Sequence, residues 1–317
     1  MTILETIYGQ LDVPAWNDDL ILQALNAYGE WSYTEQKLFT QLLRKNDVLW
    51  DGGAFLGTFG IGVSQLAAAQ GKELSCLLSI EPNPELHQCL KENLARNAPC
   101  KYQVVPSAVG RMAGMLQPIV GADDANINHG ALAYRPCGDE VVGAVNCSTM
   151  LQLREFYGAY DALKLDLEGM EADAIRSDSE YLRRRKPVIW AECNEALSSV
   201  MLLEAMIELD YIPVFVAFPA FRSQNFKLNP NQMFPMAYEA ALIAATKELL
   251  EGFDPSVVGE EVIMHVVLDE RDLRRALWTT PRWSMPEWTD LSRPELVALL
   301  GRLAQQQELR HFLKENI

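Results

Sequence analysis

The chain has 317 residues, about half of them apolar, and it carries 43 acidic against 27 basic side chains for a net charge of -16. A chain of this length and composition can bury a large core, which predicts a globular protein. Its negative charge repels phosphate backbones and anionic lipids, so we expect no nucleic-acid partner and no binding to a membrane surface.

Residues 1–46 are predicted to form a helical lead-in, because leucines recur at helical spacing over 20–25 and 38–43. The N-terminus lacks the basic start and the continuous apolar run of a secretion signal. No later apolar run reaches the roughly 18 residues of a membrane span. We therefore expect a cytoplasmic protein with no membrane span.

Short apolar runs then alternate with helical patterns, which is typical of a parallel sheet covered by helices on both faces. Helices are predicted over 60–70, 85–97 and 196–209. The strand candidates are VLWDGG (48–53), LSCLLSIEP (74–82), KYQVVPSAVG (101–110), ALKLDLEG (162–169), PVIWAEC (187–193), YIPVFVAF (211–218) and EVIMHVVLD (261–269). The predicted fold class is α/β, a Rossmann-like, doubly wound and mostly parallel seven-stranded sheet.

This predicted core domain covers residues 47–269. A Gly- and Asn-rich excursion over 110–150, with one further strand candidate in VVGAVNC, interrupts the alternation where a loop can face an acceptor. Residues 270–317 form a Trp-rich extension that ends in a predicted helix. We expect the tryptophans to pack this segment onto the domain and the amphipathic helix to dock on the body or on a second chain, giving a homo-oligomer.

The stretch DGGAFLG, Asp51 to Gly57, follows the first strand and precedes the first helix of the core. A glycine-rich turn at this place lets the backbone approach a nucleotide-like ligand. The spacing is D-x-G-A-x-x-G, which departs from the dinucleotide pattern G-x-G-x-x-G. The carboxylate of Asp51 suits a ligand without phosphate that carries an ammonium and a sulfonium, as S-adenosylmethionine does.

Two further strand ends support this interpretation. Glu81 ends the second strand, where a carboxylate can accept hydrogen bonds from both ribose hydroxyls. Ser107 and Ala108 end the third strand, where an adenine ring can lie. For Asp51 or Glu81 taken alone, a helix-capping or solvated carboxylate is the preferred interpretation. The order of the turn, the acid and the Ser-Ala pair at successive strand ends favours the nucleotide site.

Four stretches, VLWDGGAFLGTFGI, SIEPNPELHQCLKENLARNA, PSAVG and DALKLDLEGMEADAIR, together resemble the FkbM-type S-adenosylmethionine-dependent methyltransferases. The hallmarks of that family are a D-x-G-A-x-x-G turn, an E-P-x-P strand end and a K-[ILV]-D-[ILV]-E-G-x-E segment. The resemblance covers residues 28–235. It implies a sheet with an antiparallel last strand, S-adenosylmethionine as cofactor, and methyl transfer to a hydroxyl of a saccharide or natural product.

The resemblance also implies a set of cofactor-binding residues. The set is Asp51, Gly53, Ala54 and Gly57 in the turn, Glu81, Pro82 and Asn83 at the ribose, Ser107 and Ala108 at the adenine edge, and Glu30 and Tyr33 of the lead-in. Trp50 and Gly52 stand where the family more often has aliphatic residues, a departure that concerns packing more than chemistry.

A hydroxyl must lose its proton to act as a nucleophile, so a general base within hydrogen-bond reach of it is expected. Alternation along the strand predicts that Asp166 and Glu168 point to one side at its carboxyl end, near the methyl group, with Asp166 also close to the cofactor. Glu192 ends the next strand and is a third candidate base. Capping or another structural function is the alternative for each of these acids.

His129 in the excursion is a candidate base and acceptor ligand, although a loop histidine is commonly just solvated. Asn194, Arg222 and Asn225 are candidate ligands of the acceptor, which we expect to be a small molecule or a saccharide. The adjacent acids at 123–124 have no partner at ligand spacing, so no metal is predicted.

Two alternatives from other classes stay open. A dinucleotide oxidoreductase of the NAD type shares the sheet but is disfavoured by the spacing of the turn. A non-catalytic methyltransferase-like binding module keeps the fold and lacks turnover. Stronger stabilisation by NAD than by S-adenosylmethionine favours the first of these, and absence of methyl transfer favours the second.

Overall fold

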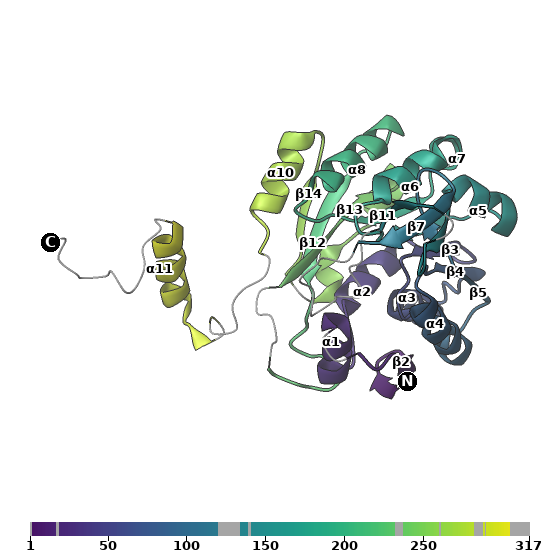
Figure 1. Ribbon diagram of the computed structural model, residues 1–317. Coiled ribbons are helices and arrows are strands. Elements are labelled where there is room, and N and C mark those ends of the chain that lie inside the picture. Colours follow the sequence, from purple (N-terminus) through teal and green to yellow (C-terminus); the bar gives the residue numbers. More distant parts are fainter. Residues whose placement is uncertain are drawn as a thin grey trace.

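The computed structural model describes residues 2–16, 19–119, 134–138, 141–231, 237–259, 261–281, 288 and 290–304. Its centre is an eight-stranded sheet between two layers of helices (Figure 1). In sheet order the strands are β14 (Ile263–Val266), β12 (Val214–Pro219), β13 (Tyr238–Ala244), β11 (Val188–Glu192), β10 (Ala162–Leu165), β3 (Val48–Gly52), β4 (Cys76–Ile80) and β5 (Tyr102–Val105).

The strands from β11 to β5 are parallel, whereas β13 runs antiparallel to both of its neighbours and β14 runs antiparallel to β12. This arrangement confirms the Rossmann-like α/β fold class. The described sheet has one strand more than the seven predicted, because β13 was not recognised. Its sequence, YEAALIA, is rich in alanine, which favours helices and is depleted in strands, so only its place between β11 and β12 makes it a strand.

Helices cover both faces of the sheet, as predicted. One layer holds α1 (Leu20–Tyr28), α2 (Tyr33–Gln41), α3 (Thr58–Ala69) and α4 (Pro84–Asn97), and the other holds α5 (Met150–Tyr157), α6 (Glu171–Ser177), α7 (Ser179–Arg185), α8 (Leu197–Glu208) and α10 (Glu270–Trp278). Along each strand, alternate side chains point to opposite helix layers. Trp190 is buried against the layer that contains α1 to α4, and Trp50 against the layer that contains α5 to α8 and α10. The predicted helices over 60–70, 85–97 and 196–209 are confirmed as α3, α4 and α8.

The first residues of the chain correct one expectation. They form a hairpin of β1 (Thr2–Thr6) and β2 (Gly9–Val13), and the helical part of the lead-in begins only at Leu20. Gly9 closes the turn at φ 103, a conformation that glycine adopts without strain. The hairpin rests on α4, where Asn93 Oδ1 accepts a hydrogen bond from the backbone N–H of Asp12 at 2.7 Å. A partner 81 residues away in the chain leaves no local signal in the sequence.

The excursion forms a second sheet. Its described strands are β6 (Ala108–Val109), β9 (Val145–Ser148), β7 (Gly114–Pro118) and β8 (Tyr134–Cys137), in that order. The third predicted strand is therefore divided, since its first half is β5 of the main sheet and its second half is β6 of this one. The strand predicted in VVGAVNC is present as β9. His129 and the acids at 123–124 lie outside the described residues.

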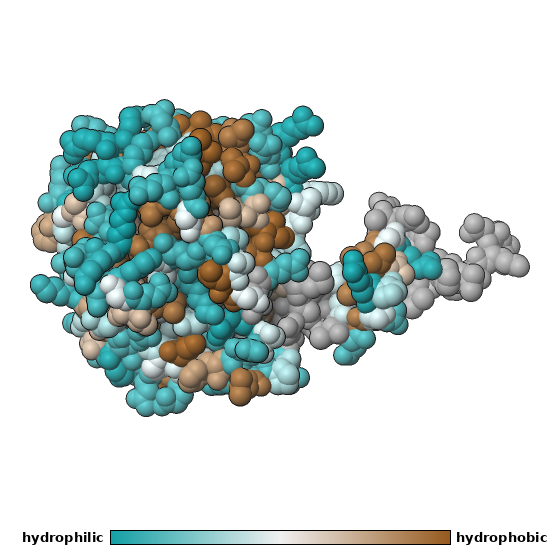
Figure 2. All heavy atoms as spheres, turned by 180° about the vertical axis from the view of Figure 1, so that it is seen from behind, coloured by the Kyte–Doolittle hydropathy of each residue, from teal (hydrophilic) through white to brown (hydrophobic). Residues whose placement is uncertain are grey.

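In the C-terminal extension, α10 was not predicted, and α11 (Arg293–Ala304) stands apart from the body of the molecule (Figure 1). Three apolar residues of α11, Val297, Leu300 and Leu303, are 64%, 45% and 51% exposed (Figure 2). Trp278 is 89% exposed, so the predicted packing of tryptophans is not formed at this residue. Across the described residues, every helix is too short or too polar to cross a bilayer.

The turn after β3 yields a stability prediction. Gly53 has φ 75, and a Cβ added to it comes within 1.8 Å of the carbonyl oxygen of Asp166, whereas Gly71 has φ 72 and open space around it. Gly53→Ala is therefore expected to lower the free energy of unfolding by more than about 3 kcal/mol, and Gly71→Ala by about 1 kcal/mol. Urea unfolding of the two variants measures both losses, and equal losses contradict the close approach of the two backbones.

Candidate active site

A pocket lies at the carboxyl ends of β3, β4 and β10, where the strand order reverses and open α/β sheets bind their ligands. It holds about 660 Å³ of space, including the part open to solvent. Its predicted residues are Gly53, Glu81, Pro82, Ser107, Ala108, Asp166 and Glu168, and its other lining residues are Ile21, Phe55, Val109, Tyr134, Leu167 and Met170.

The glycine turn is tied to the end of the neighbouring strand. The backbone N–H groups of Gly53 and Ala54 both donate to the carbonyl oxygen of Ile80 at 3.0 Å. Ala54 and Gly57 do not line the pocket. A Cβ on Gly57 comes within 2.8 Å of Leu90 Cδ1, so this glycine lets α3 and α4 pack closely. Of the predicted turn residues, Gly53 alone presents its backbone to the pocket.

Glu81 follows β4 and is 6% exposed. Its Oε2 accepts from the backbone N–H of Phe55 at 2.9 Å and its Oε1 from that of Asn83 at 2.8 Å. Burial raises the pKa of Glu81 to about 7. Each carboxylate oxygen keeps a second lone pair for a hydroxyl of the ligand. Asn83 itself caps α4, with Oδ1 accepting from Glu85 N at 3.0 Å, and does not line the pocket.

Ser107 and Ala108 close the other end of the pocket. Ser107 Oγ lies 2.8 Å from the carbonyl oxygen of Ala108 and 3.0 Å from Ser148 Oγ, so its hydroxyl is held in place. Tyr134 reaches the pocket from β8, and burial raises its pKa to about 12. Sequence reasoning missed Tyr134 because it belongs to the second sheet, whose pairing cannot be read from local patterns.

The loop after β10 carries the acidic side chains of the site. Because β10 ends at Leu165, the predicted alternation of Asp166 and Glu168 along a strand is wrong. Glu168 instead adopts φ 53, and Glu171 holds the loop by accepting from the backbone N–H groups of Leu167 at 2.7 Å and Gly169 at 3.2 Å. The loop conformation, and not a strand, brings both side chains to the pocket.

Asp166, Glu168 and Glu192 form an acidic cluster in which one carboxylate oxygen of each lies within 4.8 Å of the others. Burial, and then the charge of Asp166, raises the pKa of Glu168 to about 8. Burial, and then Asp166 and Glu168, raises the pKa of Glu192 well above its usual range. Near neutral pH this cluster can both take up and release a proton. Its three oxygens also match the ligands of a hard cation such as Mg²⁺, although no metal is predicted from the sequence.

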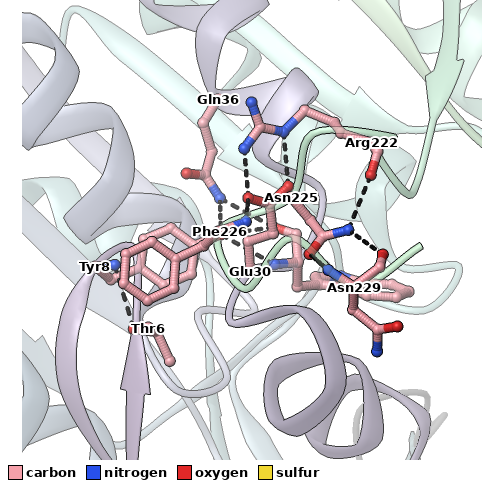
Figure 3. Close-up of polar contacts among 9 residues, drawn as sticks. Thr6, Tyr8, Glu30, Gln36, Arg222, Asn225, Phe226 and Asn229 are labelled. Atoms are coloured by element: carbon pink, nitrogen blue, oxygen red, sulfur yellow. Dashed lines mark hydrogen bonds and ion pairs between the residues drawn. The ribbon is translucent and has the colours of Figure 1, made fainter. Parts of the chain in front are cut away.

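Glu30, Arg222 and Asn225 lie outside the pocket lining, in a network that joins the lead-in to the segment 221–231 (Figure 3), and Tyr33 packs against Arg222. The Arg222 guanidinium pairs with both carboxylate oxygens of Glu30, with Nε to Oε1 at 2.6 Å, and stacks on the ring of Tyr33. The amide of Asn225 donates to the carbonyl oxygen of Asn229 at 2.7 Å. These contacts clamp the segment onto the lead-in.

Asn194 and Asp51 are also absent from the pocket lining. The Asn194 carbonyl oxygen accepts from Ser199 Oγ at 2.6 Å near the start of α8. Asp51 is fully buried beneath the turn, beside Gly60 of α3 and 4.0 Å from Lys164 Nζ. Burial raises its pKa to about 6. The structure therefore places Asp51 behind the residues that face the ligand.

The pocket fits S-adenosylmethionine by its chemistry. Gly53 lines the pocket with its backbone, and the buried Glu81 keeps free lone pairs. Three lining residues are acidic, and none of the described lining residues is a lysine or an arginine. A cationic ligand without phosphate suits these charges, whereas a dinucleotide pyrophosphate does not. The fold and the pocket thus define a Rossmann-like domain that binds an adenosine cofactor.

A family model described as the methyltransferase FkbM domain matches residues 58–227, more than half of the chain. The chain therefore belongs to the FkbM methyltransferase family. This confirms the resemblance seen in the motifs and S-adenosylmethionine as the cofactor. Among curated proteins, the sequence search found no match.

Solved structures to which the chain is similar include an FkbM methyltransferase from Methylobacillus flagellatus KT, with 17% identity, 68% of this chain and 48% of that chain covered, and a TM-score of 0.41. A precorrin-6y C5,15-methyltransferase from Geobacter metallireducens GS-15 is 17% identical over 68% of this chain and 87% of that chain, with a TM-score of 0.37. The Pyrococcus abyssi tRNA (uracil-54, C5)-methyltransferase in complex with S-adenosyl-L-homocysteine is 16% identical over 66% of this chain and 36% of that chain, with a TM-score of 0.33. The match spans about half the length of the first of these chains.

The buried acids predict how stability depends on pH. The pKa values of Glu81 and Glu168, about 7 and about 8, lie above those of an unfolded chain, so folding favours the protonated forms. The stability that these two protonated carboxyl groups contribute is present at low pH and is lost as the pH rises through their pKa values. The unfolding temperature of the ligand-free chain should therefore rise from about pH 8.5 to about pH 6. Glu168→Gln should flatten this dependence, and the exposed Glu155→Gln should not.

The clamp predicts the effect of removing Arg222. Arg222→Met leaves the buried carboxylate of Glu30 unpaired and should lower the free energy of unfolding by about 3 kcal/mol. Lys227→Met, which removes an exposed ammonium bonded to the carbonyl oxygen of Asn26, should cost less than about 1 kcal/mol. Denaturant unfolding measures both. Unchanged stability of the Arg222 variant with a raised KM for the acceptor contradicts a structural function for the pair.

Proposed function

We propose that the chain transfers the methyl group of S-adenosylmethionine to a hydroxyl of a small-molecule acceptor, either a saccharide or a natural product. The observation that carries this proposal is the acidic cluster of Asp166, Glu168 and Glu192 beside the cofactor pocket. A neutral hydroxyl needs a base to take its proton, and this cluster contains Glu168, whose pKa of about 8 suits a base near neutral pH.

The cofactor site is proposed from the residues that line the pocket. Glu81 accepts from the ribose hydroxyls, Ser107 and Ala108 border the adenine, and Asp166 faces the cationic part of the ligand. Bound S-adenosylmethionine supplies a methyl carbon made electrophilic by the adjacent sulfonium. Gly53 lets the turn after β3 and the loop after β10 approach closely at the pocket, because a larger residue there collides with the backbone of Asp166.

Glu168 is the proposed base. Its pKa of about 8 makes its ionised form a stronger base than an ordinary glutamate, and it lines the pocket at the edge of the cluster. It takes the hydroxyl proton as the acceptor oxygen attacks, and Glu192 can share that proton across the cluster. His129 stays a proposed alternative for the base and for an acceptor ligand.

Three broader expectations stay proposals with structural support. The six cysteines are free thiols, which agrees with a reducing cytoplasm. The exposed apolar residues of α11 suit a homo-oligomer formed through the tail. The acidic pocket and the net charge of -16 suit a neutral or cationic acceptor in preference to nucleic acid.

Methyl transfer with labelled S-adenosylmethionine tests this function on a panel of hydroxylated saccharides and natural products. The acceptor oxygen should carry the label. Glu168→Gln should lower kcat by about 100-fold because the base is lost, while affinity for S-adenosylmethionine stays within about threefold of the wild-type value. Glu195→Gln, a change at an exposed acid near the same edge of the sheet, should leave kcat unchanged.

Two results contradict the proposal. Label on nitrogen or carbon excludes O-methylation. Stronger thermal stabilisation by NAD than by S-adenosylmethionine favours an oxidoreductase. A third result, loss of turnover on addition of EDTA that Mg²⁺ restores, contradicts the expectation of no metal, and the acidic cluster is then the candidate metal site.

A further inference from the structure

Three adjacent strands place an unusual row of residues side by side beneath the pocket. In the parallel register Lys164 of β10 pairs with Asp51 of β3 and with Trp190 of β11. Paired residues of parallel strands point to the same face of the sheet, here the face under α2 and α3. All three are buried, Asp51 and Trp190 completely and Lys164 to 5% exposure. An ammonium at this depth needs partners, because an unpaired buried charge is very costly.

Carboxylates from three elements face this ammonium. Lys164 Nζ lies 2.9 Å from Asp166 Oδ2 and 4.0 Å from Asp51 Oδ1. Glu35 of α2 is the third, and its Oε1 accepts from the indole N–H of Trp190 at 2.8 Å. Burial lowers the pKa of Lys164, but Asp166, Asp51 and Glu35 together raise it above its usual value, so the side chain stays charged.

The same row explains the place of Asp51. Within the described part of the chain, neither of its carboxylate oxygens makes a well-formed hydrogen bond, and it does not line the pocket. From α3, the ring of Phe59 lies 5.3 Å from the ammonium and shields this side from water. Asp51 is therefore stabilised mainly by Lys164 and by the start of α3, and it can act on a ligand only through its neighbours.

Asp166 connects the row to the pocket. Its side chain is 37% exposed, it lines the pocket, and its Oδ2 is held by Lys164. Asp166 lies just beyond the end of β10, where its backbone N–H still donates to the carbonyl oxygen of Gly52 of β3 at 3.0 Å. The side chain of Asp166 is held by the Lys164 ammonium beneath it.

We propose that Lys164 is the positioning residue of the cofactor site, with its ammonium orienting the Asp166 carboxylate toward the cationic part of S-adenosylmethionine while Asp51 and Glu35 hold the ammonium from behind. This inference rests on the proposed function, because it takes the ligand of Asp166 to be the cofactor. It changes Asp51 from a direct cofactor contact to a residue that acts through Lys164.

Removing the ammonium has a consequence that simple loss of packing does not have. Without it, Asp51, Glu35 and the partly exposed Asp166 have no cation among them, and Glu168 and Glu192 lie near Asp166 as well. Acids grouped in this way take up protons more readily. A protonated site attracts the cationic ligand less. Cofactor binding should then fail at a pH where the wild-type chain still binds, and return at higher pH. Removing Asp51 instead relieves the repulsion, so binding should persist to lower pH.

The test is the affinity for S-adenosylmethionine, measured by titration calorimetry from about pH 6 to about pH 9. Lys164→Gln should weaken binding at least about tenfold near pH 7 and move the acid limb of the affinity profile up by about one pH unit. Lys164→Arg, which keeps the charge, should stay within about threefold of the wild-type affinity. Asp51→Asn should move the acid limb of the affinity profile to lower pH.

Lys72→Gln is the matched control, since Lys72 Nζ donates to the carbonyl oxygens of Thr40 and Gln41 and lies away from the pocket lining. Its profile should equal that of the wild type. An unshifted acid limb in Lys164→Gln overturns the inference, and so does a loss of affinity at every pH in Asp51→Asn, which shows direct contact. If Lys164→Gln does not fold, the profiles of Lys164→Arg and Asp51→Asn decide. A wild-type chain that does not bind the cofactor overturns the proposed function as well.

Discussion

The ion pair between Lys164 and Asp166 is the interaction on which the geometry of the site depends. It is the point where the buried face of the sheet meets the pocket, with the ammonium inside and the carboxylate at the ligand. Around it, burial raises the pKa values of the acids Glu81 and Glu168, and none of the described pocket-lining residues is a lysine or an arginine. A cationic cofactor supplies the positive charge that these acids attract.

Parts of the chain that are distant in sequence close around this pair. The lead-in contributes Ile21 to the pocket and Glu35 to the charged row, and it is held in place through the ion pair of Glu30 with Arg222 (Figure 3). The second sheet contributes Tyr134. The core domain thus supplies the strand ends, while the segments added to it close the pocket. Acceptor choice is expected to depend on these added segments.

The sequence-based predictions agree best with the structure for residues that directly follow a strand. Gly53, Glu81 and Ser107 follow strands and line the pocket, because a hydrophobic strand followed by a turn is a local signal and parallel strands bring their ends to one edge. The predictions fail for elements whose packing partners are distant in the sequence. The alanines of β13 favour a helix until β11 and β12 pair with them, and the hairpin over residues 2–13 depends on its packing against α4.

By itself the sequence determined the fold class, the family, the cofactor and most residues at the edge of the pocket, because order and spacing along the chain are enough to place strand ends. Only the tertiary structure decided what each charged side chain does. Asp51, Glu30 and Arg222 have the residue types of a binding site, yet their partners are other side chains of the protein. Charges are paired by distance in space and by burial, and neither quantity can be read from spacing along the chain.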